Sequence, residues 1–323
     1  MNRLSLAEYR SRAAGHAAAV AATPGIDAFC SAPLWQLAAH DRLHEASATG
    51  HLLLERDGAW LVGAELDQPR ILFPLEAAWM FGCPLAGDPQ AATALVHDAI
   101  AAGNPDGGAP LAIVLSGLVR DGAMHRALRT LHTTGRGLRE HPGSDVMLID
   151  LADGVEAWLA RRSKKFRRTL RAAEAEIPGL EIVDASRENP ASLFDRLLAI
   201  QRGSYKWREG TDIFQMPGYA AFYRALLDGL HAVGGLRLLF ARRGGVDLAH
   251  IFGGVCGTTY RGLQMSYLEE ARDLGLGNRL QLENLRLRAA EGVATYDLGM
   301  VAPYKERWAD RREERVVLFW IGR

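Results

Sequence analysis

A glycine loop before a helix-forming segment is the feature of this sequence with the clearest chemical meaning. Residues 272–277 read Arg-Asp-Leu-Gly-Leu-Gly, and Asn278, which is suited to cap a helix, precedes a run of helix-forming residues. The first N–H groups of a helix lack intrahelical partners and lie at the positive end of its dipole, so they attract anions. Glycine lets a ligand approach the backbone, and Arg272 can add a charge-assisted hydrogen bond. The spacing predicts an anion site, and an ordinary strand-to-helix turn is the alternative.

The helix expected after this loop is apolar on two opposite sides. Leu280 and Leu287 lie on one side, and Leu282, Leu285 and Ala289 lie on the other. We therefore expect it to be packed between two layers.

Strand and helix patterns alternate along the chain twice. Before the loop, residues 236–245, 246–257 and 259–269 predict a three-stranded meander, and residues 294–300 predict another strand after the helix. A similar order, without the glycine loop, recurs more weakly in the first half. The sequence thus predicts an α/β protein of two related units, 1–152 and 153–323, of which only the second keeps the anion site.

A basic segment lies between these units. Seven of the residues from Arg161 to Arg171 are Lys or Arg, in a helix-prone stretch of about 154–177 that Pro178 and Gly179 end. Such a helix can dock the phosphates of a nucleotide or an RNA. The alternative is a solvated strut whose charges meet carboxylates.

The bulk composition limits the classes of partner. Basic and acidic residues number 38 each, which argues against a surface tuned as a whole for nucleic acid or anionic membrane. The three cysteines are widely spaced, and His125, His132 and His141 show no ligand spacing with nearby carboxylates or cysteines, so we expect no disulfide framework and no metal site. The N-terminal residues lack an apolar signal segment, and no apolar run approaches the length of a membrane span. We expect a cytoplasmic protein.

The meander, the R-x-x-G-x-G loop, the helix and the strand "ATYDLGM" together resemble the core of the GNAT superfamily of N-acyltransferases. In that superfamily the loop holds the pyrophosphate of acyl-coenzyme A. The ending "YDLGMVAPYKERW" and the segment "SKKFRRTLRAAE" are similar to the FemAB-like and CelD-like branch, in which two GNAT-type units stand in tandem. The resemblance covers roughly residues 30 to 320, and it implies that residues 1–152 form a degenerate GNAT-like unit.

One departure from the branch bears on the donor. Branch members often have a Pro-Gly pair where this chain has Leu276 and Gly277, and those that use aminoacyl-tRNA lack a well-formed coenzyme A loop. Here the loop is nearly complete. The resemblance therefore favours an acyl-CoA donor.

The resemblance also implies which residues form the site. The donor-binding residues would be Met265, Ser266, Tyr267, Leu268, Arg272, Gly275, Leu276, Gly277 and Asn278, with backbone N–H groups of 265–268 meeting the thioester carbonyl. The catalytic candidates are Lys305, Tyr304, His250 and Asp297.

Each catalytic candidate has a chemical role, and three of the four also have a structural alternative. His250 can accept the amine proton or be a core histidine. Tyr304 can protonate the departing thiolate or pack on Trp308, and the Lys305 ammonium can offset negative charge. Asp297 can orient Lys305 or the amine, or merely cap a loop.

These observations predict an acyl-CoA-dependent N-acyltransferase, in particular an acetyltransferase, with a small amine acceptor such as an amino sugar or an amino acid derivative. One alternative is an aminoacyl-tRNA-dependent transferase of the FemAB type, the only reading that includes a nucleic acid. The other is a binding module that keeps the fold without turnover. The segment 201–214, with Tyr205, Trp207 and Glu209, can form an acceptor loop or a plain helix-to-helix connection.

Overall fold

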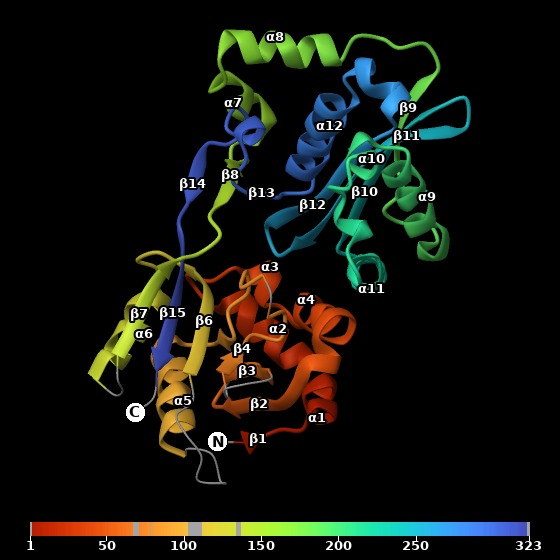
Figure 1. Ribbon diagram of the computed structural model, residues 1–323. Helices are drawn as coiled ribbons and strands as arrows, with labels where there is room; N and C mark the ends of the chain where they lie inside the picture. The colour runs from red at the N-terminus through yellow and green to blue at the C-terminus, as the bar shows by residue number, and fades with distance from the viewer. Residues whose placement is uncertain (1, 67–70, 78, 103–111, 134–136, 322–323) are drawn as a thin grey trace. The chain divides into compact units, whose positions relative to one another are not determined.

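The computed structural model describes residues 2–66, 71–77, 79–102, 112–133 and 137–321. They divide into two compact units, residues 1–145 with 313–323, and residues 146–312. Each unit is a mixed sheet flanked by helices (Figure 1), and the predicted α/β class is confirmed. In the part of the chain described, no helix has the length and apolar character needed to cross a bilayer.

The first unit is built on a sheet with the strand order β1-β2-β3-β4-β6-β15-β7, in which β5 also pairs with β3. Its strands are β1 Asn2–Arg3, β2 Ala48–Arg56, β3 Ala59–Leu66, β4 Ile71–Phe73, β5 Leu85–Ala86, β6 Ala112–Val119, β7 Gly137–Pro142 and β15 Arg315–Ile321. Its helices are α1 Leu6–Ser11, α2 Ala13–Ala22, α3 Ala28–Ser31, α4 Pro33–Ala39, α5 Pro89–Ala102 and α6 Ala123–Leu128.

The second unit is built on a sheet with the strand order β14-β8-β13-β12-β11-β10-β9. Its strands are β8 Val146–Asp150, β9 Leu180–Asp184, β10 Leu236–Arg243, β11 Val246–Cys256, β12 Thr259–Tyr267, β13 Thr295–Met300 and β14 Arg311–Glu313. Its helices are α7 Gly154–Ala160, α8 Lys164–Ala173, α9 Pro190–Arg202, α10 Tyr205–Arg208, α11 Tyr219–Ala232 and α12 Leu276–Ala290.

The sequence predicted one division, at residue 152, whereas the structure divides the chain after residue 145 and again after residue 312. Strand β15 pairs with β6 and β7, so the C-terminal segment completes the sheet of the first unit. Strand β8 pairs with β13 and belongs to the second unit. Neither pairing has a local sequence signal, because both join segments far apart in the chain.

The basic segment 154–177 forms two helices rather than one. Helix α7 ends at Ala160, and Ser163 caps α8 by accepting a hydrogen bond from the N–H of Phe166 at 3.2 Å. Both helices lie within the second unit.

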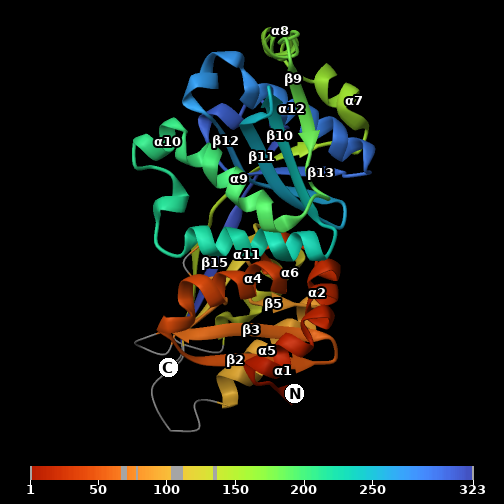
Figure 2. The same cartoon turned by 90° about the vertical axis from the view of Figure 1, so that its right-hand side faces the viewer.

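Helix α12 is packed between two layers, as its pattern predicts. Leu276 and Leu280 belong to a buried cluster with residues of β10 and β11. Leu282 and Leu285 belong to another cluster that includes Trp158 of α7 and residues of α8. Helices α9 and α11 cover the opposite face of the sheet (Figure 2).

Candidate active site

The divergence of strands β12 and β13 creates the opening of the site. These strands pair in parallel only where residues 259–261 meet residues 295–297. Beyond that point β12 continues to Tyr267 along β11, while β13 continues to Met300 along β8. The unpaired ends leave a gap within the second unit.

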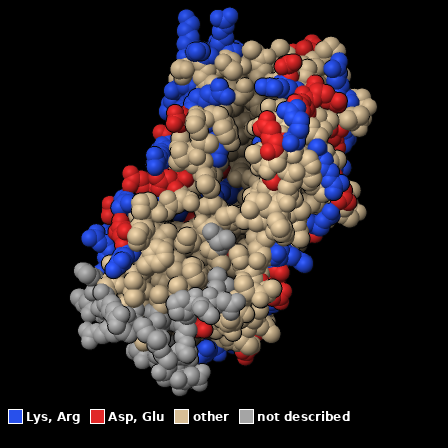
Figure 3. Space-filling model, in the orientation of Figure 1, with Lys and Arg blue, Asp and Glu red and all other residues tan. Residues whose placement is uncertain are grey.

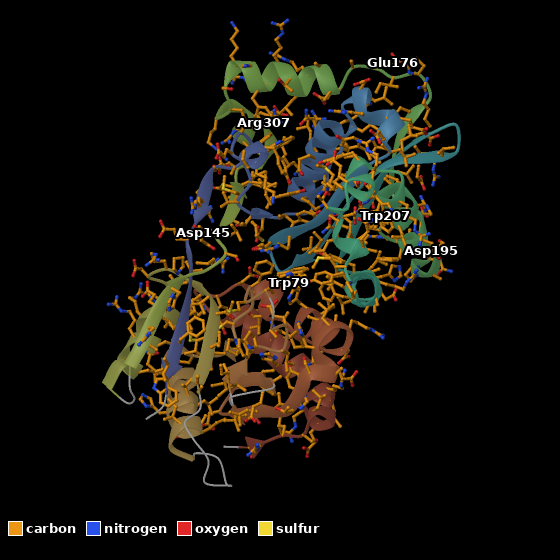
Figure 4. The ribbon with its side chains drawn as sticks, in the orientation of Figure 1. Trp79, Asp145, Glu176, Asp195, Trp207 and Arg307 are labelled. Atoms are coloured by element: carbon orange, nitrogen blue, oxygen red, sulfur yellow. The ribbon has the colours of Figure 1, made fainter. Side chains whose placement is uncertain are left out.

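Two adjoining cavities of about 270 Å³ each occupy this region. They share Met265, Tyr267, Gln281, Leu298, Tyr304 and Lys305. The first cavity extends to α10, on which Trp207 is labelled in Figure 4, and the second extends to the glycine loop and to Arg307. The two cavities therefore adjoin along these six residues.

The second cavity contains the predicted anion site. Gly275 has φ +65°, a left-handed conformation that glycine adopts readily, and α12 begins directly after it. Asn278 is therefore not the cap of the helix; Gly275 takes that position because the chain turns into the helix there. The first intrahelical bond runs from the N–H of Arg279 to the carbonyl of Gly275 at 3.3 Å, so the N–H groups of residues 276–278 precede it.

Three cationic side chains and Gly277 also line the second cavity. Arg272, Lys305 and Arg307 line the second cavity together with residues 275–278. A Cβ added at Gly277 would lie 3.7 Å from the Cε of Met265, which is ordinary contact. Gly277 thus has no steric need to be glycine within the protein, whereas a ligand close to the backbone would create one.

The end of β12 offers backbone donors to the gap. The N–H of Leu268 donates to the carbonyl of Leu248 at 2.8 Å, so it faces β11. By the alternation of an antiparallel ladder, the N–H of Ser266 also faces β11, while those of Met265 and Tyr267 face the gap. Of residues 265–268, whose N–H groups we expected to meet a thioester carbonyl, Met265 and Tyr267 direct their N–H groups into the gap.

Lys305 lies at the junction of the two cavities. Its Nζ donates to the carbonyl of Met300 at 2.7 Å and lies 5.7 Å from the ring centroid of Tyr304. Burial, with a smaller effect of the nearby Arg261 charge, lowers the pKa of Lys305 to about 8. An ammonium with this pKa is charged at neutral pH and can respond to changes in the charge beside it.

Tyr304 is 54% exposed and lines both cavities. Burial of part of its ring raises the pKa of its phenol, so the hydroxyl is protonated at neutral pH. Trp308 stacks on Trp158 with ring centroids 5.7 Å apart and meets Phe166 edge-on. The rings that pack on Trp308 are thus those of Trp158 and Phe166, while Tyr304 lines the cavities.

Asp297 is buried in an ion pair. Its Oδ2 accepts a hydrogen bond from Arg261 at 2.5 Å, and its Oδ1 accepts one from the N–H of Gly299 at 2.6 Å. Both carboxylate oxygens are thus engaged, and Lys305 donates to Met300 instead. Asp297 holds the end of β13 in shape, and it is not among the described residues that line either cavity.

His250 lies in the core on β11. It has no exposed surface, and neither imidazole nitrogen has a hydrogen-bond partner among the described residues. Burial, with a smaller effect of Lys206, lowers the pKa of His250 to about 3, so the ring is neutral at physiological pH. It is not among the described residues that line either cavity, so the structure does not bring it to the other candidates.

Lys206 is a cavity residue that the sequence patterns did not single out. It lies on α10, lines the first cavity and donates from Nζ to the carbonyl of Met265 at 2.9 Å. Burial lowers the pKa of Lys206. Tyr205, which the sequence analysis named, also lines this cavity. The four-residue helix carries no motif that predicts the direction of the Lys206 side chain.

In the described part of the chain, no cluster of three or more His, Cys, Asp or Glu residues could hold a metal ion. The site consists of backbone N–H groups, cations, hydroxyls and amides. Such a set can bind an anionic ligand and stabilise charge that develops on oxygen or sulfur.

Residues 160–306 match the family model described as an acetyltransferase (GNAT) domain. The fold resembles that of FemX, with a TM-score of 0.65 and 14% identity over 98% of this chain and 97% of that chain. It also resembles the C-terminal DUF2156 domain of a protein assigned as a lysylphosphatidylglycerol synthetase from Agrobacterium fabrum (TM-score 0.61, 14% identity, 96% and 92% covered). A third similar structure is L-PGS from Bacillus licheniformis (TM-score 0.56, 11% identity, 87% and 90% covered).

Among proteins with curated descriptions, none matches the sequence. The residues that match the family model lie within the second unit, which also contains the diverging strands β12 and β13. The likeness to the fold of FemX extends over both units. Residues 160–306 therefore match a GNAT domain, and the fold of the chain as a whole is similar to that of FemX.

Proposed function

We propose that the chain is an acyl-CoA-dependent N-acyltransferase that transfers a short acyl group to an amine. The observation that carries this proposal is that the two cavities adjoin through a shared lining. One end presents the N-terminus of α12 with Arg272, and the other reaches the unpaired ends of β12 and β13. A donor with a phosphate at one end and a thioester at the other fits this pair of cavities.

Each part of this pair of cavities has a role in the transfer. The N–H groups of residues 276–278 and the Arg272 guanidinium bind pyrophosphate. The N–H groups of Met265 and Tyr267 polarise the thioester carbonyl, which the free amine attacks at carbon. As the C–S bond breaks, the Lys305 ammonium stabilises the thiolate and the Tyr304 hydroxyl can protonate it, while the amide nitrogen loses its proton to solvent.

Coenzyme A binding tests the donor assignment. We expect coenzyme A to raise the melting temperature of the wild type and to bind in calorimetry, because a ligand of the native state stabilises it. Arg272→Glu should lose this binding. Arg243→Glu is the matched control, because Arg243 is also exposed but lies at the β10–β11 turn and lines neither cavity. Equal binding by both variants would refute the proposed phosphate site.

A second candidate is an aminoacyl-tRNA-dependent transferase. The observation that favours it is the basic face of α8, on which Lys164, Lys165, Arg168 and Arg171 are exposed. Figure 3 shows Lys and Arg side chains standing out at the end of the second unit where Figure 1 draws α8. Arg161 and Arg162, which precede α8, instead pair with Asp310. The fold likeness to FemX over nearly the whole chain is compatible with this reading.

Binding of aminoacyl-tRNA distinguishes the two donors. Under the second candidate, affinity should fall steeply with salt, and Arg168→Glu should reduce the slope of log K against log salt by about one. Under the first, coenzyme A binds and tRNA shows only weak binding that this variant does not change. A binding module without turnover would bind coenzyme A but leave acetyl-CoA unconsumed with every amine offered.

A further inference from the structure

The charge of the first cavity restricts the acceptor. Two ammonium groups, those of Lys206 and Lys305, line this cavity, and none of the described residues that line it is acidic. Within the described residues, neither ammonium has a carboxylate partner; they donate to the carbonyls of Met265 and Met300. The cavity therefore carries net positive charge.

Asp297 and Asp212 act on the two lysines through space, and neither is among the described residues that line the first cavity. Asp297 is engaged by Arg261 and by the N–H of Gly299. Asp212 is buried, and its Oδ1 accepts the N–H of Phe214 at 2.9 Å; it acts on Lys206 only through space. The Oδ2 of Asp212 has no hydrogen-bond partner among the described residues, but Asp212, like Asp297, does not line the cavity that a cation would enter.

An amine acceptor arrives in water mainly as a cation, since alkyl amines titrate well above neutral pH. Two ammonium groups within a partly buried cavity repel it, because like charges at low effective dielectric interact strongly. An acceptor that brings its own anion removes this penalty. Lys206 keeps donor capacity, because an ammonium has three donors and the carbonyl of Met265 takes one.

The same cavity offers a second donor. Ser266 lines the cavity, is 3% exposed, and its hydroxyl has no hydrogen-bond partner among the described residues. A buried hydroxyl without a partner is costly, so a ligand oxygen or a water completes it. Lys206 and Ser266 together can serve the two oxygens of one oxyanion.

Resting on the proposed function, we propose that the acceptor is an amine that carries an oxyanion, a carboxylate or a phosphate, and that Lys206 and Ser266 bind this oxyanion. The amine nitrogen then lies toward the thioester, where it displaces the thiolate and forms an amide. Lys206 does not serve the phosphate of the donor, because it lines only the first cavity, while Arg272 and residues 275–278 line the second.

Protection of Lys206 from acylation by N-hydroxysuccinimide acetate tests this without turnover. Labelling of each lysine is followed by peptide mass spectrometry, with and without coenzyme A. The probes are N-acetylglycine, its neutral isostere N-acetylglycinamide, and inorganic phosphate, all at matched ionic strength. Lys165, exposed on α8, is an internal control that no probe should protect.

We expect N-acetylglycine or phosphate to slow the labelling of Lys206 about tenfold at about ten times its dissociation constant, by mass action. N-acetylglycinamide should give no protection. Protection by N-acetylglycine identifies a carboxylate, and protection by phosphate alone identifies a phosphorylated amine. Equal protection by the amide, or none by either anion, overturns the proposal.

The variant Ser266→Ala separates the binding pair from a general effect of salt. It should weaken protection of Lys206 by the anionic probe while the labelling rate without probe stays unchanged. Unchanged protection in this variant would contradict the role of Ser266. Failure of coenzyme A to bind would refute the donor assignment but would leave these labelling results readable.

Discussion

Lys305 is the one cation among the described residues that lines both cavities, and the effect of replacing it by methionine can be worked out. The variant keeps a chain of similar length but cannot stabilise the departing thiolate. Losing one such preorganised group typically lowers turnover by about a hundred- to a thousandfold. Affinity for coenzyme A should change much less, because the charge that Lys305 answers develops mainly during the reaction.

The pH dependence of kcat tests the role of the Lys305 ammonium more specifically than the loss of rate does. With a pKa of about 8, Lys305 is about nine-tenths protonated at pH 7 and about one-tenth protonated at pH 9. If the ammonium is the active form, its contribution to kcat falls about tenfold over this range. Lys305→Arg should keep much of the rate and lose this descending limb, since a guanidinium stays charged.

Steady-state kinetics with acetyl-CoA, followed by release of free thiol between pH 6 and 9.5, measure both effects. Lys305→Arg is the control for the charge, and dividing the wild-type profile by that of the arginine variant removes the titration of the acceptor amine. Near-normal turnover in Lys305→Met would refute this reasoning. So would a loss of donor binding in proportion to rate, which would make Lys305 a phosphate contact.

Three further predictions concern other parts of the chain. Gly275→Val should abolish coenzyme A binding in calorimetry, whereas Gly244→Val, which carries the same left-handed strain at a turn outside both cavities, should lower stability without affecting binding. Calorimetry should also give one coenzyme A per chain, and a stoichiometry of two would show that the first unit binds it as well. His250 has a folded pKa of about 3, so its stabilising effect is present above pH 6.5 and is lost as the unfolded state takes up a proton below that value. Urea unfolding should show the wild type losing about 1 kcal/mol more than His250→Leu between pH 6.5 and 5.5, and equal losses would contradict the buried neutral ring.

Local patterns predicted the parts of the site that depend on local structure. The meander, the loop at 272–277 and the two apolar sides of α12 are all short-range signals, and the structure has each of them. The cap of α12 was misassigned, because Asn278 is a good capping residue by type while the left-handed turn of Gly275 decides where the helix begins.

Contacts between segments far apart in the chain determine three features that local sequence patterns do not predict. The strand pattern around His250 is the same whether its side chain faces a cavity or the core, and only the pairing of β11 with its neighbours settles the face. Lys206 lies in a four-residue helix without periodicity, so its direction depends on how α10 meets β12. Strand β15 joins the first sheet across a large sequence separation, and no local signal indicates that pairing.

Under the proposed function, the distribution of cations within the second unit separates donor binding from acceptor binding. Arg272 and Arg307 line only the cavity at the start of α12, and Lys206 lines only the cavity beside α10. Lys305 lines both, and its lowered pKa reflects burial and two other cations nearby. An anion bound in either cavity would favour the charged form of Lys305, because opposite charges favour ionisation. Binding of both substrates would thus charge the group that must stabilise the thiolate, at the point where the C–S bond breaks.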